Sequence, residues 1–176
     1  MRTFAFFIAL SFVTTAYADW FVLAEPDQSD WSEKRKATYA EFESPMPEAV
    51  VTIDSLGIEA HVFPDSLKNA LEGGVSHVSG TSLPGQLGNM AIAGHRDSFF
   101  RKLENVPIGT EITIKTEDQV YTYQVSEISI VDALDVSVLE DTEENVLTLI
   151  TCHPFYYQGY APDRYIVRAT STWLSP

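Results

Sequence analysis

The chain contains a single cysteine, Cys152, among its 176 residues. A disulfide within the chain is therefore excluded, and a metal site built from several thiolates is excluded as well. The four histidines are spread along the chain without the H-x-x-x-H spacing of a helical metal site. The sequence therefore predicts no metal and no cofactor, and it leaves Cys152 either as a small buried hydrophobe or as a reactive group.

Basic residues are also scarce. Eleven Lys and Arg stand against 25 Asp and Glu, which gives a formal net charge of −14. Such a balance offers no attraction to nucleic acid phosphates or to anionic lipid headgroups. We therefore expect no nucleic-acid partner, and we interpret the acidic surface as a contribution to solubility.

No apolar run reaches the roughly 20 residues that a membrane-spanning helix needs. At the start of the chain Arg2 precedes an apolar stretch from Phe4 to about Val13, and an A-Y-A sequence ends at Ala18. This layout is typical of a secretory signal peptide with an A-x-A cleavage site. We assign residues 1–18 to a signal peptide or to a short retained membrane anchor. Both alternatives place the rest of the chain outside the cytoplasm.

Residues 19–47 are predicted to form a connector. It contains a short helix from Asp30 through Phe42, in which Glu33 gives a start similar to a capping box. The two prolines of "SPMPE" favour an extended spacer and mark the end of the connector. Residues 48–174 then form one domain, because a chain of this length can build one well-packed core but would leave two cores thin.

From residue 50 onward, short apolar or alternating runs bounded by Gly, Pro, Asn and Asp predict β-strands. Short helices are expected at Ser66–Leu71, capped by Asp65, and at Ser98–Glu104. About seven or eight strands with few helices favour a closed or nearly closed β-barrel, with an immunoglobulin-like sandwich as the alternative. The expected strands are "VVTIDSLGIEAHVF" as a pair, "NMAIAGH", "TEITIKT" and "VYTYQVSEISIV" as a hairpin, "VLTLIT" and "RYIVRAT".

Cys152 follows the apolar run "VLTLIT" directly. Export exposes an unpaired thiol to oxidation unless the thiol is buried or functional. In a strand, successive side chains point to opposite faces, so Thr151 and His153 share one face and Cys152 takes the other. His153 is therefore a poor partner for the thiol, and we interpret it as a surface or supporting histidine.

The remaining candidates follow from their positions in the predicted elements. His95 is the best general base, because it emerges at the end of a buried strand and precedes Arg96-Asp97. His77 lies in "GVSHVSGT", which reads as a Gly-rich loop, and is a candidate for lining the site. His61 occupies an ordinary strand position. Arg164 offers a permanent charge and several N–H donors to a developing oxyanion, with a surface salt bridge as the alternative.

The segment "TLITC", Thr148 to Cys152, matches the TLxTC signature of the sortases. The order of an A-G-H segment, this signature and a downstream arginine resembles the sortase set of His, Cys and Arg. The resemblance runs from about Val50 to Ala169 and includes "GTSLPGQLGNMAIAGHRD". The segments "CHPFYY" and "APDRYIVRA" look most like the class D or proteobacterial sortases.

The resemblance implies a mainly β fold with a closed sortase-type barrel of about eight strands. It also implies a cysteine transpeptidase that acts on secreted proteins with an LPxTG-like C-terminal sorting motif, through a thioacyl intermediate and an amine acceptor at the cell surface. Carried over by position, Cys152 is the nucleophile, His95 the general acid and base, and Arg164 the oxyanion donor. Thr151 and His77 are the expected substrate-binding residues.

Two alternatives to a transpeptidase stay open on the sequence. A secreted cysteine peptidase would use the same side chains with water as the acceptor. A non-catalytic domain would bind a peptide along a strand edge and bury its cysteine in the core. In each reading the domain works outside the cytoplasm, in the periplasm or at the outer face of the cytoplasmic membrane, with attachment through the N-terminus as an open alternative.

Overall fold

The structure is a computed structural model that describes residues 21–65, 67–157 and 159–172. The signal peptide or anchor expected at residues 1–18 lies outside this range. Within the described part of the chain, no helix combines the length and the apolar character that crossing a bilayer requires. Whether residues 1–18 are a cleaved signal peptide or a retained membrane anchor therefore stays a prediction.

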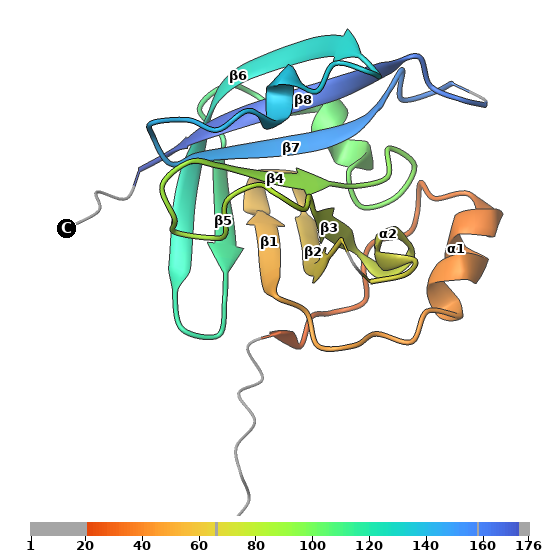
Figure 1. Cartoon of the computed structure of the whole chain (residues 1–176). Helices are drawn as coiled ribbons and strands as arrows, with labels where there is room; N and C mark the ends of the chain where they lie inside the picture. Colours follow the sequence, from red (N-terminus) through yellow and green to blue (C-terminus); the bar gives the residue numbers. More distant parts are fainter. Residues whose placement is uncertain (1–20, 66, 158, 173–176) are drawn as a thin grey trace, which may run out of the picture.

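Strands are the main regular structure of the described residues, and the helices are short (Figure 1). The α-helices are α1 Glu33–Ala40 and α2 Ala70–Gly73, and the 3-10 helices are η2 Asp54–Leu56, η3 Arg101–Asn105 and η4 Ser137–Leu139. The strands are β1 Ala49–Ile53, β2 Ile58–Pro64, β3 Val75–His77, β4 Asn89–Ala93, β5 Glu111–Lys115, β6 Val120–Asp132, β7 Val146–His153 and β8 Asp163–Ser171.

The strands close into a barrel in the order β1-β2-β3-β4-β7-β8-β6-β5, because β5 pairs back with β1. Neighbouring strands are antiparallel except for the parallel pairs β2–β3 and β4–β7. The long strand β6 reaches both β5 and β8, with a register shift at residues 125–127. The predicted closed β-barrel is confirmed, and the sandwich is excluded because its two sheets would not join.

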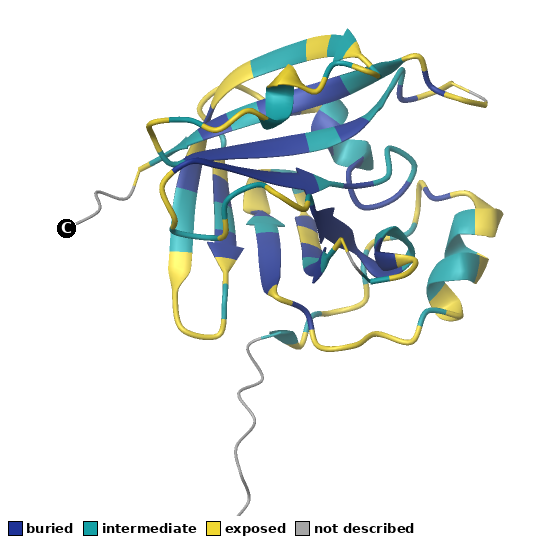
Figure 2. Cartoon of the chain, viewed as in Figure 1, coloured by how far each residue is buried: buried dark blue, intermediate teal, exposed yellow. Residues whose placement is uncertain are grey.

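Strands β4 and β7 are buried on both faces over most of their length (Figure 2). Leu147 and Leu149 of β7 are fully buried in the core. On the other face of β7, the Thr148 hydroxyl donates to Asn89 Oδ1 at 2.7 Å, and Asn89 Nδ2 donates to Val138 O at 2.9 Å. Because both faces are covered, these strands read as continuous apolar runs, and their ends are rigidly placed.

Helix α1 forms where the sequence predicts a helix, but it begins later than expected. Its N-cap is Ser32, whose hydroxyl accepts a hydrogen bond from Arg35 N–H. The predicted start at Asp30 is wrong, and Glu33 takes no part in a capping box because Arg35 occupies the position at which a box needs Glu or Gln. Ser32, and not Asp30, is therefore the N-cap of α1.

The two other predicted helices also differ from the structure. Helix α2 begins only at Ala70, because Asn69 has a left-handed φ of 64° and a helix cannot continue through it from Asp65. Ser66 itself lies outside the described residues. The helix expected at Ser98–Glu104 is instead a turn followed by the 3-10 helix η3. Short helices of one turn have too few residues for a periodic pattern to fix their bounds.

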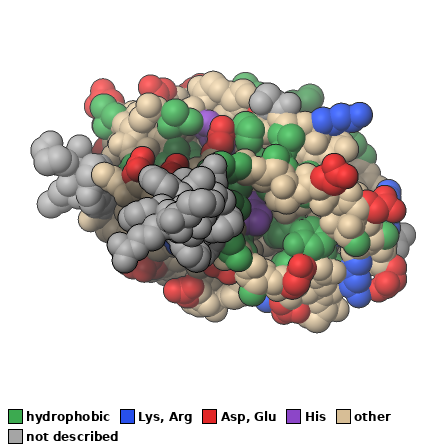
Figure 3. Space-filling model, turned by 90° about the horizontal axis from the view of Figure 1, so that it is seen from below, with side chains coloured by type: hydrophobic (Ala, Val, Ile, Leu, Met, Phe, Trp, Pro, Cys, Tyr) green, Lys and Arg blue, Asp and Glu red, His purple; other side chains and the backbone are tan. Residues whose placement is uncertain are grey.

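Acidic side chains are scattered over the face of the molecule seen in Figure 3, among hydrophobic and uncharged ones. They do not gather into one dense cluster on that face, in keeping with a net charge of −14 spread over the chain. This distribution agrees with a contribution to solubility, and the expected absence of a nucleic-acid partner stays a prediction.

Candidate active site

Strands β7 and β8 place Cys152 and Arg164 side by side. The antiparallel register pairs these two residues directly. Directly opposed side chains share one face of the sheet, with Cβ atoms about 5 Å apart. Arg164 Nη1 donates to Asp163 O at 2.9 Å and to Ala161 O at 3.3 Å, which fixes the guanidinium at the start of β8. The thiol of Cys152 is free and partly exposed.

The parallel pairing of β4 with β7 brings His95 to the same end of the barrel. Beyond the strand end, Gly94 N–H donates to Ile150 O at 3.0 Å. The Thr151 hydroxyl donates back to Gly94 O at 2.7 Å. His95 directly follows Gly94, and Cys152 directly follows Thr151, so this pair of bonds holds the backbone at His95 next to the backbone at Cys152.

The glycine of the A-G-H segment is required by packing. A Cβ atom at Gly94 would lie 2.5 Å from Cδ2 of Phe100, a fully buried core residue. The backbone then turns back on itself, and the N–H groups of Ser98 and Phe100 donate to His95 O at 3.4 and 3.2 Å. The backbone of His95 is thus held from both sides, in line with its expected place at the end of a buried strand.

His95, Cys152 and Arg164 line one pocket of about 210 Å³. The pocket is completed by Arg35, Arg96, Asp97, Gly159, Tyr160 and Ala161. Three side chains from distant parts of the sequence therefore converge in one open site. The alternative of an inert cysteine sealed in the core is inconsistent with this placement.

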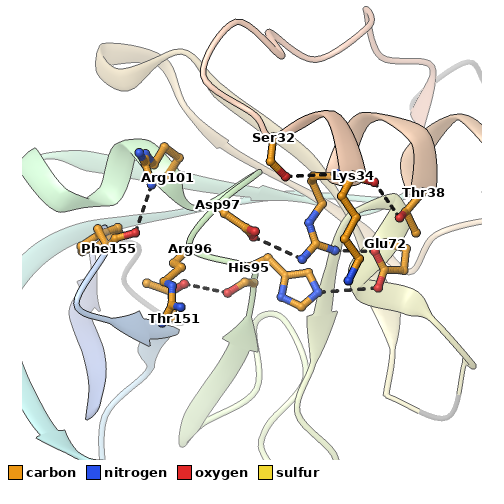
Figure 4. Close-up of polar contacts among 12 residues, drawn as sticks. Ser32, Lys34, Thr38, Glu72, His95, Arg96, Asp97, Arg101, Thr151 and Phe155 are labelled. Atoms are coloured by element: carbon orange, nitrogen blue, oxygen red, sulfur yellow. Dashed lines mark hydrogen bonds and ion pairs between the residues drawn. The ribbon is translucent and has the colours of Figure 1, made fainter. Parts of the chain in front are cut away.

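The imidazole of His95 lies among charged side chains (Figure 4). Its Nε2 is 3.9 Å from Glu72 Oε1, and Arg35 pairs with Glu72 through Nη1 and with Asp97 through Nη2. Burial lowers the pKa of His95 below the ordinary 6.5, Arg35 and Arg96 lower it further, and Glu72 and Asp97 oppose the decrease. The ring therefore stays neutral, and able to accept a proton, at lower pH than a free histidine.

Arginines that follow His95 hold the loop that follows Cys152. Arg96 Nη2 donates to Tyr157 O at 2.7 Å, and Arg101 Nη1 donates to Phe155 O at 3.1 Å. These hydrogen bonds join the segment after β4 to the loop after β7, in addition to the pairing of the two strands.

The structure places Thr151 and His77 outside this pocket. Thr151 is 2% exposed, and its hydroxyl is engaged with Gly94. His77 lies in the three-residue strand β3 and is 8% exposed, with Nε2 3.1 Å from Ser82 O. The prediction that His77 lies in a Gly-rich loop is wrong, because so short a strand shows no period in the sequence. Both residues have supporting contacts, and their expected contact with substrate receives no support from this geometry.

The two remaining histidines also lie outside the Cys152 pocket. The ring of His153 stacks on Tyr165 at 6.1 Å and meets Phe155 edge-on. His61 Nε2 lies 2.6 Å from Phe21 O. The contacts of His153 agree with the supporting role expected from alternation along the strand, and His61 lies in a strand as expected.

Two charged residues of the site were not identified from the sequence, Arg35 and Glu72. Asp97 was noticed only as a neighbour of His95. The order His95-Arg96-Asp97 was a usable signal for Asp97, but nothing in the sequence links α1 or α2 to the end of β4. The position of Arg35 and Glu72 beside His95 depends on how α1 and α2 pack against the barrel.

Residues 51–172 match the Sortase domain family, which is well over half of the chain. The chain belongs to the sortase family. This sortase is 30% identical to Sortase D of Bacillus subtilis (strain 168) over 135 residues, which cover 76% of this chain and 68% of that relative. The similarity supports the predicted relation to class D.

Solved sortase structures share the fold. A Clostridium perfringens Sortase D5 transpeptidase superposes with a TM-score of 0.66 at 30% identity, covering 82% of this chain and 91% of that one. Sortase A from Corynebacterium diphtheriae gives a TM-score of 0.67 at 28% identity, covering 77% and 65% of the two chains. Sortases are cysteine transpeptidases, so the predicted enzyme class is confirmed and the non-catalytic alternative is excluded.

Proposed function

We propose that this sortase cleaves an LPxTG-like sorting motif near the C-terminus of exported proteins and joins the new carboxyl end to an amine acceptor at the cell surface. The observation that carries the proposal is the shared pocket of Cys152, His95 and Arg164. A thiol, an imidazole and a guanidinium supply the nucleophile, the proton carrier and the oxyanion donor that acyl transfer requires.

In the first half of the reaction His95 takes the proton of the Cys152 thiol, and the resulting thiolate attacks the scissile carbonyl carbon to form a C–S bond. The negative charge moves to the carbonyl oxygen, where N–H groups of Arg164 stabilise it. Removing one such donor costs about 3 to 4 kcal/mol in other enzymes. His95 then gives its proton to the leaving amine as the C–N bond breaks, and a thioacyl enzyme remains.

In the second half an amine attacks the thioacyl carbon. His95, now neutral, takes the proton from the attacking nitrogen, and Cys152 leaves as the thiolate. The new amide carries the sorted protein on its acceptor. Water in place of the amine would give a hydrolysed product through the same steps, so the acceptor decides between transferase and peptidase.

A second pocket offers a place for the apolar residues of the motif. It has a volume of about 350 Å³, and His95 lines it as well. Its walls include Leu67, Ala70 and Val78, which suit the Leu and Pro side chains of an LPxTG-like peptide. A peptide that spans both pockets would present its next carbonyl groups to Cys152.

Export of the enzyme is part of the proposal. The layout of residues 1–18 supports either a cleaved signal peptide or a retained anchor, and in both cases the barrel meets secreted substrates outside the cytoplasm. Fractionation of cells followed by N-terminal sequencing of the mature protein distinguishes the two.

The decisive experiment incubates the purified chain with an LPxTG-like peptide, with and without an added amine, and weighs enzyme and products by mass spectrometry. We expect an acyl adduct on Cys152 and an amine-joined product, and neither with Cys152→Ala. A hydrolysed product alone, at saturating amine, would assign a peptidase. Intact peptide and unmodified enzyme over a range of motifs would contradict the proposal.

The pH dependence gives an independent check on the Cys152–His95 pair. Because thiolate and imidazolium coexist only between two macroscopic pKa values, the rate should pass through a maximum. A rate that is flat from acid to alkaline pH would remove this pair from the mechanism.

A further inference from the structure

Helix α1 lies outside the region matched by the family, residues 51–172, yet it contributes to the active site. Arg35 lines the pocket with His95 and Cys152, and its side chain is only 16% exposed. No residue of α1 is fully buried. The apolar packing of α1 itself comes from Tyr39, which is partly buried against the core and meets Phe99 edge-on at 6.0 Å.

Aromatic residues before and after α1 hold it in position. Trp31 is 6% exposed and meets Phe99 edge-on at 4.9 Å. Phe42 packs on Phe63 of β2 at 5.5 Å. Phe99 belongs to the turn that follows His95, and Figure 1 shows α1 beside α2 at the edge of the barrel. The helix is therefore attached directly to the segments that surround the imidazole.

From this position Arg35 joins two carboxylates that flank His95. It pairs with Glu72 of α2 through Nη1 and with Asp97 through Nη2, the latter at 3.2 Å. The planar guanidinium suits such a double contact. The other oxygen of Glu72 stays 3.9 Å from His95 Nε2, which is longer than a hydrogen bond. Glu72 is thus close to the imidazole but held by Arg35.

We propose that Arg35 is a positioning residue for His95, because it binds Glu72 and Asp97 and so prevents both carboxylates from closing on the imidazole. The ring then stays free to exchange protons with Cys152 and with the leaving and attacking amines, so the inference rests on the proposed function.

Charged and titratable groups from several elements line the two pockets that include His95. They are Arg35 of α1, Asp65 before α2, Glu72 of α2, Arg96 and Asp97 after β4, Cys152 of β7, Tyr160 of the following loop and Arg164 of β8.

The direct and the indirect effect of Arg35 both lower the pKa of His95. Its positive charge disfavours the imidazolium and lowers the pKa of His95, whereas Glu72 and Asp97 raise that pKa. Removing Arg35 takes away the cation and releases both carboxylates toward the ring. The pKa of His95 should therefore rise when Arg35 is replaced by a neutral residue.

The test follows the imidazole proton signals of the full chain by NMR titration, with His95→Gln used to assign the His95 signal. We expect His95 to titrate at higher pH in Arg35→Gln than in the wild type. Arg35→Lys keeps the charge but loses the double contact and should fall between them. Lys36→Gln is the matched control, because Lys36 pairs with the exposed Glu33 on the same helix and should leave His95 unchanged.

A double-mutant cycle separates the release of Glu72 from the loss of the Arg35 charge. In Arg35→Gln/Glu72→Gln, the rise in the His95 pKa should be largely cancelled. Should Arg35→Gln fail to fold, the Arg35→Lys and Glu72→Gln titrations still test the arrangement. A His95 titration in Arg35→Gln that superimposes on the wild type overturns the proposal, even if activity falls, because Arg35 is then only a structural bridge.

Kinetics provide a second readout. In Arg35→Gln, kcat should fall about 10- to 100-fold, as expected for a misplaced proton carrier, with little change in KM. The acid limb of kcat/KM should move to higher pH together with the NMR titration. If the wild-type enzyme joins no peptide to any amine, the proposed function fails while the NMR result still decides the role of Arg35.

Discussion

The two sides of the active-site pocket are held in place by different forces. Cys152 and Arg164 lie on paired strands, and the backbone hydrogen bonds of β7 and β8 set their spacing. On the other side, His95 follows the end of β4, and ion pairs among Arg35, Glu72 and Asp97 surround it. Backbone pairing is largely independent of pH and salt, whereas ion pairs depend on both.

This difference matches the chemistry that each side would perform. A nucleophile and an oxyanion donor must be fixed relative to the scissile carbonyl, and a pair of strands provides that rigidity. A general acid and base must gain and lose a proton near the working pH, so its charged neighbours matter as much as its position. Substitutions on the strand side should therefore change rates without moving the pH dependence, whereas those on the other side should move the pH dependence as well as the rate.

The largest effect should come from the nucleophile. Cys152→Ala should lower acyl transfer by more than about 10³-fold and abolish the thioacyl adduct. The melting temperature should hardly change, because the thiol is partly exposed and makes no disulfide. Mass spectrometry and thermal melting measure both. Adduct formation by Cys152→Ala would place the nucleophile elsewhere.

Arg164 on the strand side should have the next largest effect. Arg164→Gln should reduce kcat by about 10²- to 10³-fold, since the oxyanion loses a charged donor. Arg164→Lys keeps the charge but not the planar set of donors, and it should retain part of the rate. Steady-state kinetics with a sorting peptide provide the measurement. Equal rates for the glutamine variant and the wild type would leave the oxyanion to other donors.

Thr151 connects the two sides, and its removal should have a moderate effect. Thr151→Val loses the hydrogen bond to Gly94 and should cost about 1 kcal/mol of unfolding free energy. It should also reduce kcat by about tenfold, because the β4 end can then shift relative to Cys152. Thr151→Ser keeps the hydroxyl and is the control. Full activity in Thr151→Val together with a loss in Thr151→Ser, which lacks the methyl group, would instead favour a role of the methyl group.

The smallest effect concerns the acid limb of the wild-type pH profile. Because burial, Arg35 and Arg96 lower the pKa of His95, the ring stays neutral as the pH falls below 6.5 and is protonated only at lower pH. The acid limb of kcat/KM should therefore lie below 6.5. A limb above 6.5 would mean that Glu72 and Asp97 outweigh the arginines around the ring.

Much of the strand side was predictable, because it depends on local pattern. The runs "VLTLIT" and "RYIVRAT" indicate strands, and alternation correctly puts Cys152 and Thr151 on opposite faces. If Cys152 faces the site, the same alternation turns the side chain of Thr151 away from it, which is evidence against a contact between Thr151 and the substrate. Strand β3 and the start of α2 were not predicted correctly, since three or four residues carry no period and the left-handed Asn69 has no unique signature.

By itself, the sequence indicated a β-barrel, the family and three residues that are proposed to carry the chemistry: His95, Cys152 and Arg164. Only the tertiary structure decided what surrounds His95. Arg35 and Glu72 meet there because Trp31 and Phe42 hold the connector against the barrel. Such ion pairs join elements far apart in the chain, and their existence depends on how those elements pack, which no local pattern of residues records.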